Sequence, residues 1–115
     1  MSGIPPLAND DDIAIVLCAC RKRQAFVSRA GGRITERYLL QVWHSTFAHL
    51  QEAVANHVEN KRRVYRKLAD HGRQIGMHAN VTLYDGLDIY VEMQIVRGQV
   101  VILAAHNHYT TPLPQ

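Results

Sequence analysis

The chain has 115 residues, of which 47% are hydrophobic and 20% charged, with a formal net charge of +3, as in an ordinary globular protein with one modest core. No apolar run is long enough to span a bilayer, and the acidic start MSGIPPLANDDD differs from the basic and then apolar start of a signal peptide. We therefore expect a cytoplasmic protein without a membrane partner, with one domain over residues 10–110 between flexible tails at 1–9 and 111–115.

Residues 10 to about 29 have the spacing of an amphipathic helix. Apolar and weakly polar positions recur there at steps of three and four residues, namely Ile13, Val16, Leu17, Cys20, Gln24 and Val27. Asn9 or Asp10 is suited to cap the start of this helix, and Gly31-Gly32 to end it. A strand over residues 13–20 is the competing prediction, because the stretch is rich in Ile and Val. We favour the helix.

The two cysteines, Cys18 and Cys20, lie two residues apart in this stretch. A zinc site needs about four ligands, and the chain has no second cysteine pair. On a helix the two side chains diverge, since neighbours on one face are three or four residues apart. We therefore expect hydrophobic, buried cysteines, no metal site and no cofactor.

The stretch from Thr35 to His71 contains neither proline nor glycine. An amphipathic stripe with two polar members runs along it, formed by Leu40, Trp43, Phe47, Leu50, Val54, His57, Lys61, Val64 and Leu68. A continuous helix of this length is long for a small domain, and Asn56 and Asn60 interrupt the pattern. We expect a long helix that bends or breaks near residues 56–60.

The final third changes to the period of β-strands, with turn signals at Asp85-Gly86 and Arg97-Gly98. Three antiparallel strands are predicted, over about 80–84, 87–96 and 99–106. The predicted fold class is therefore α+β, with two or three N-terminal helices packed on a C-terminal three-stranded antiparallel β-meander.

Two-residue turns would pair Tyr84 with Leu87 and Val96 with Gln99, which gives the meander one apolar face to pack on the helices. The opposite face is mixed, with Asp88, Glu92 and Gln94 among apolar residues. Such a face often marks an interface, and symmetric dimers are the commonest oligomers. We predict a homodimer through this face or the sheet edge, with the interface residues Val81, Leu83, Tyr90, Val101 and Leu103.

The run KRRVYRK, residues 61–67, carries all the excess positive charge. Without its five basic residues, eight basic side chains face ten acidic ones, and the net charge falls from +3 to −2. On a helix these residues would form two basic ridges, with an aromatic ring able to stack on a base. The candidate residues for binding nucleic acid or another anion are Lys61, Arg62, Arg63, Tyr65, Arg66 and Lys67.

Two other interpretations of this run stay open. It could be a solvated helix face, since Glu59 would neutralise Arg63 and Asp70 would neutralise Arg66 at helical spacing. It could also bind an acidic protein partner.

The segment HNHYT, residues 106–110, holds the candidates for catalysis. His106 and His108 project to the same side of an extended segment, so they could serve as acid or base or begin a metal site. The expected register places His106 opposite Ile89 and His108 opposite Leu87, on the helix-packed face. His78 lies too far along the sheet to join them, and no third metal ligand is identifiable.

We favour a non-enzymatic, dimeric binding module whose basic helix contacts RNA, DNA or an acidic protein. One alternative is a DNA-binding regulator of winged-helix type, with KRRVYRK in the recognition helix and the Asp85-Gly86 hairpin as its wing. In layout only, the chain also resembles the RelE-type toxins, small ribonucleases, with which it shares no sequence motif. The resemblance implies His106 or His108 as acid or base, Tyr109 as an auxiliary, and Arg62, Arg66 and Arg97 as phosphate ligands.

Overall fold

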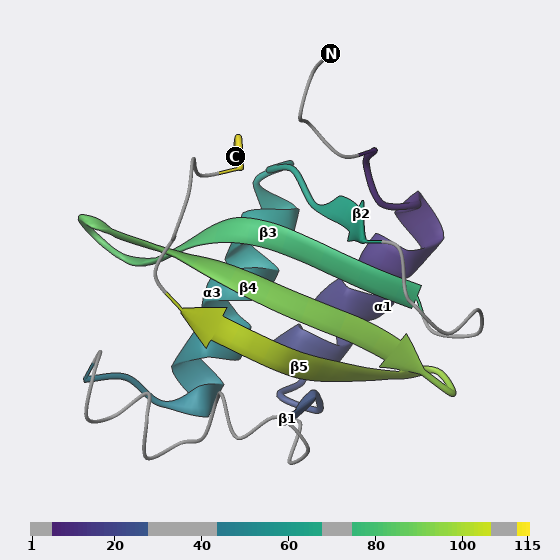
Figure 1. Ribbon diagram of the computed structural model, residues 1–115. Helices are drawn as coiled ribbons and strands as arrows, with labels where there is room; N and C mark the ends of the chain where they lie inside the picture. Colours follow the sequence, from purple (N-terminus) through teal and green to yellow (C-terminus); the bar gives the residue numbers. More distant parts are fainter. Residues whose placement is uncertain (1–5, 28–43, 68–74, 107–112) are drawn as a thin grey trace.

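In the computed structural model, the described part of the chain comprises residues 6–27, 44–67, 75–106 and 113–115. In this part, two helices lie on one side of a five-stranded sheet and leave its other side uncovered by helix (Figure 1). The predicted mixture of helices and sheet is confirmed, but the sheet has five strands instead of three. No helix among these residues is long and apolar enough to cross a membrane.

Helix α1 spans Asp10–Arg21, so the helix predicted over residues 13–20 is confirmed against the competing strand. The side chain of Asn9 caps it by accepting a bond of 2.7 Å from the backbone N–H of Asp11. The first turn is acidic and the last turn contains Arg21, which suits the helix dipole.

The predicted end of this helix near residue 29 is wrong. Arg23 has a φ of 57°, and its N–H bonds to the carbonyl of Cys20, while the N–H of Gln24 bonds to that of Ala19. These two bonds form a Schellman motif, in which the left-handed position is usually a glycine. The chain then enters the short strand β1, Phe26–Val27, so Gln24 and Val27 are not helical.

Helix α3 spans Phe47–Glu59 and ends in the same way. Lys61 has a φ of 59°, and the N–H groups of Lys61 and Arg62 bond to the carbonyls of Val58 and His57. The chain turns near residues 56–60 as expected, but the described residues that follow, 61–67, are not helical. Residues 28–43 and 68–71, which also belong to the predicted helices, lie outside the described residues.

The sheet has the strand order β1-β5-β4-β3-β2, with β1 parallel to β5 and all other neighbours antiparallel. Both predicted hairpin pairings, Tyr84 with Leu87 and Val96 with Gln99, are confirmed. The remaining strands are β2 (Tyr65–Lys67), β3 (Ile75–Tyr84), β4 (Leu87–Val96) and β5 (Gln99–His106).

Two bulges change the predicted register. Leu83 is an extra residue in β3, so Val81 pairs with Ile89 and not with Tyr90. Because a shift of one residue moves a side chain to the opposite face, Val81 and Leu83 are buried in the core, and their predicted place on the outer face is wrong. A second bulge at Leu103 pairs His106 with Tyr90 and not with Ile89.

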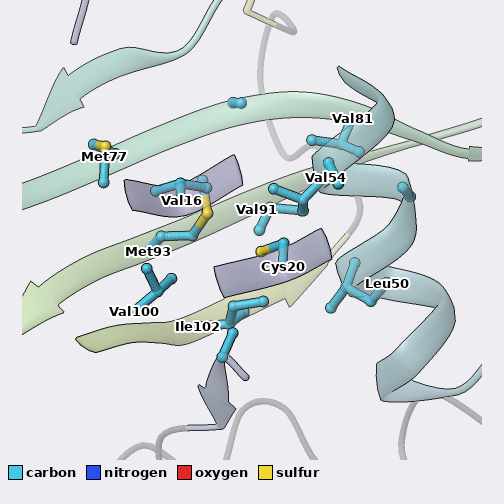
Figure 2. Close-up of a cluster of buried hydrophobic side chains, with 14 of the residues drawn as sticks. Val16, Cys20, Leu50, Val54, Met77, Val81, Val91, Met93, Val100 and Ile102 are labelled. Carbon is cyan, nitrogen blue, oxygen red and sulfur yellow. The ribbon is translucent and has the colours of Figure 1, made fainter. Parts of the chain in front are cut away.

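The core lies between the two helices and the inner face of the sheet (Figure 2). Each fully buried aliphatic side chain there stabilises the fold by about 1.5–3 kcal/mol relative to an exposed one. Gln51 of α3 is buried as well, and its Oε1 accepts a bond of 3.0 Å from the N–H of Ala25 just before β1. The labelled core side chains are Val16, Cys20, Leu50, Val54, Met77, Val81, Val91, Met93, Val100 and Ile102.

Candidate functional site

The basic segment, residues 61–67, is not the predicted helix. It begins with Lys61 in the left-handed conformation at the end of α3 and finishes as strand β2, which pairs with β3 at the edge of the sheet. Side chains therefore alternate between two sides of a strand instead of forming helical ridges. The winged-helix alternative placed its recognition helix in this segment, and residues 61–67 do not form a helix.

The alternation divides the segment into buried and exposed members. Val64 packs in the core, whereas Tyr65 and Lys67 pair with His78 and Gly76 and lie on the outer face of the sheet. Tyr65 is fully buried, and its hydroxyl donates a bond of 2.8 Å to the carbonyl of Pro114. Its ring is therefore not available to stack on a base.

Four cations of the segment are exposed and carry no side-chain ion pair within the described residues: Lys61, Arg62, Arg63 and Arg66. We call them the four exposed cations. Glu59, expected to neutralise Arg63, is bound to Arg21 at 2.6 Å. The other expected acid, Asp70, lies outside the described residues. The described structure thus leaves these charges accessible to an anion.

Residues from both predicted tails hold the backbone of this segment. The N–H of Arg66 donates to the carbonyl of Pro6 at 2.8 Å, and the N–H of Ala8 donates to the carbonyl of Val64 at 2.9 Å. The N–H of Arg63 donates to the carbonyl of Gln115 at 2.9 Å. These hydrogen bonds hold the backbone that carries the four exposed cations in one position.

On the outer face, Tyr65 and Lys67 join Tyr90, a predicted interface residue, together with His78 and Glu92, which are not among the predicted site residues. Lys67 Nζ lies 2.7 Å from Glu92 Oε1, and His78 Nδ1 lies 3.1 Å from the Tyr90 hydroxyl. The ring of His78 also meets both tyrosine rings edge-on, at centroid distances of 6.1 and 5.7 Å. We call these five residues the outer-face cluster.

Burial controls the protonation of this cluster. It lowers the pKa of His78, with help from the charge of Lys67, and it raises the pKa of Tyr90. His78 is therefore neutral and Tyr90 protonated at neutral pH. His78 Nε2 is buried and has no hydrogen-bond partner within the described part of the chain. The alternation of polar residues in β3 and β4 indicates this cluster only if the register includes the bulge at Leu83.

Of the other predicted interface residues, Val101 and Leu103 are half-buried, and Val101 lies on the outer face. The backbone of His106 pairs with Tyr90, while His108 and Tyr109 lie outside the described residues. Among the residues that are described, no three His, Cys, Asp or Glu side chains form a group that could hold a metal ion.

No protein-family model matches the chain, and no curated protein and no solved structure matches it either.

Proposed function

We propose that the chain is a binding module that contacts the phosphate backbone of nucleic acid through the four exposed cations. The observation that supports this proposal is that all four cations are exposed and that none has an ion pair within the described residues. Glu59, the acid expected to pair with Arg63, is bound to Arg21 instead. Lysine and arginine need only density and exposure to bind phosphates, and no sequence motif is required.

The geometry also determines the kind of binding that we expect. Since Tyr65 is buried, the segment has no exposed aromatic ring for base stacking, and recognition should depend weakly on base sequence. Four phosphate contacts release counterions, which gives a slope of log K against log salt of about −3 for single strands and somewhat steeper for duplex DNA.

The test is a fluorescence anisotropy titration of labelled single-stranded RNA and duplex DNA at several salt concentrations. The variant Arg62→Gln/Arg63→Gln/Arg66→Gln should bind weakly and lose most of the salt dependence. The matched control is Lys22→Gln/Arg23→Gln/Arg97→Gln. It removes the same number of exposed positive charges from other parts of the surface and should bind nearly as the unmodified protein does.

Equal loss of affinity in the two triple variants would mean that net charge, and not the basic segment, attracts the nucleic acid. Absence of binding to both nucleic acids would refute the proposal. The RNA is also checked for cleavage on a gel, because a cleaved RNA would favour the ribonuclease alternative.

A second candidate function is association of two copies through the outer face of the sheet. It is favoured by the half-buried apolar side chain of Val101 on a side of the sheet that no described helix covers (Figure 1). Val81 and Leu83 contribute nothing to such an interface, because both belong to the core. Sedimentation equilibrium of Val101→Glu, compared with the unmodified chain, tests it. If the unmodified chain and Val101→Glu were both monomers, this proposal would be refuted.

A further inference from the structure

A small cavity of about 210 Å³ lies beside the last turn of α3, where β3 passes the end of the chain. It is next to the basic segment but separate from the outer-face cluster, with which it shares no residue. Its lining consists of Ala53, Asn56, His57, Asn60, Arg62, Thr82 and Gln115.

Among the side chains of the lining, Arg62 is the one cation and none is a carboxylate. Two acids adjoin the lining. Glu59 is bound to Arg21, and Asp88 accepts a bond of 2.6 Å from the hydroxyl of Thr82. An anion in the cavity would therefore meet the positive charge of Arg62 and no Asp or Glu side chain in the wall. The negative charge on the main chain of Gln115, where the given chain ends, accepts a bond of 2.9 Å from the N–H of Arg63.

Existing hydrogen bonds determine which groups of the lining remain for a ligand. Asn56 Oδ1 accepts a bond of 3.2 Å from Arg21, which leaves the amide nitrogen of Asn56 as its unused donor. Gln115 Nε2 donates one of its two hydrogens to Thr82 Oγ1 at 3.2 Å. With the guanidinium of Arg62, these amides make the cavity rich in donors.

His57 supplies an acceptor. Its Nε2 lies 2.7 Å from the carbonyl of Arg63, and a carbonyl can only accept, so Nε2 carries the proton. Burial lowers the pKa of His57, so the ring is neutral at pH 7 and its Nδ1 is an acceptor. A suitable ligand is thus a compact anion with several acceptor oxygens and one hydroxyl.

We infer that this cavity binds a phosphomonoester group. A phosphate offers several acceptor oxygens to Arg62 and the amides, and its singly protonated form has a hydroxyl for His57. The source of the phosphate rests on the proposed function. Because Arg62 belongs both to the cavity and to the four exposed cations, a terminal phosphate of a nucleic acid can occupy the cavity while the adjoining phosphodiesters contact Arg63 and Arg66. A free phosphorylated small molecule is the other source.

The first experiment is a titration with inorganic phosphate followed by two-dimensional ¹H–¹⁵N NMR, with sodium chloride and sodium acetate at matched ionic strength as controls. Phosphate should shift the amide signals of Asn56, Asn60, Arg62 and Gln115, with a dissociation constant on the order of 1 mM. Arg62→Gln should weaken this binding about tenfold or more, since a charge-assisted hydrogen bond is lost. Arg23→Gln removes the same charge at a site outside both the cavity lining and the four exposed cations, and should bind phosphate unchanged.

Both arginines are exposed, so both variants should fold, which their thermal unfolding curves check. Any of three results would overturn the inference: no signal shifts at the cavity, equal shifts with acetate, or unchanged phosphate binding in Arg62→Gln.

The second experiment compares RNA oligonucleotides with and without a 5′-phosphate. Tighter binding of the phosphorylated RNA, lost in Arg62→Gln but kept in Arg23→Gln, identifies a nucleic-acid end as the source. Phosphate bound in the cavity without any binding of RNA or DNA would refute the proposed function alone and leave a small phosphorylated molecule as the ligand. Nucleic-acid binding without phosphate in the cavity would refute the inference alone.

Discussion

Replacing Lys61 with glycine should stabilise the fold. Lys61 occupies the left-handed position of the Schellman motif that ends α3, with a φ of 59°. This conformation costs an L-residue about 1–2 kcal/mol, and glycine avoids that cost. Glycine also loses more conformational freedom on folding, which takes back roughly 0.5–1 kcal/mol. We therefore expect Lys61→Gly to raise the free energy of unfolding by about 0.5–1 kcal/mol, or the midpoint of thermal unfolding by about 2–4 °C.

The matched control is Lys61→Ala, which removes the same charge but keeps a side chain in the left-handed conformation. Its stability should stay within about 0.5 kcal/mol of the unmodified protein. Urea unfolding followed by circular dichroism measures both variants. If the glycine variant were no more stable than the alanine variant, the account of this helix end would be wrong. Both variants should weaken nucleic-acid binding equally, so that stability and binding change in opposite directions for Lys61→Gly.

Two further predictions concern the sheet and the cysteines. Gly76→Ala should destabilise the fold by about 1–3 kcal/mol, because the added Cβ would lie 2.7 Å from the backbone oxygen of Lys67 and displace β2. A urea midpoint equal to that of the unmodified protein would contradict this. Cys18 is exposed, so the expectation that both cysteines are buried is wrong for Cys18. It should react readily with a thiol reagent at pH 8, whereas Cys20, which is buried and whose pKa burial raises to about 12, should react only on unfolding. Labelling of both cysteines at the same rate in the folded protein, measured by mass spectrometry, would contradict this.

The hairpins could be predicted because their turns contain the residues that the backbone requires. Gly86 and Gly98 have φ values of 80° and 77°, which are favourable for glycine. The helix ends could not be predicted in this way. Arg23 and Lys61 occupy left-handed positions where a glycine is the usual signal. Because neither residue is a glycine, the apolar spacing predicts helices that extend beyond both.

The apolar pattern predicts a helix for the basic segment because Val64 continues the apolar stripe of α3. Val64 is indeed buried, but a strand at the sheet edge buries it equally well, and hydrophobic periodicity cannot distinguish the two over so few residues. The bulges at Leu83 and Leu103 had no local signal either, since leucine is ordinary in a strand. The exposed cations of the candidate site could therefore be named from the sequence, whereas the outer-face cluster could not.

The strand geometry of the basic segment means that neighbouring residues in one run serve different surfaces. Arg66 belongs to the exposed cations, while the next residue, Lys67, belongs to the outer-face cluster through its ion pair with Glu92. A substitution at Arg66 can thus alter contacts with an anion without touching the sheet face, and a substitution at Lys67 can do the reverse. The two surfaces are free to diverge independently in evolution, although seven consecutive residues encode part of both.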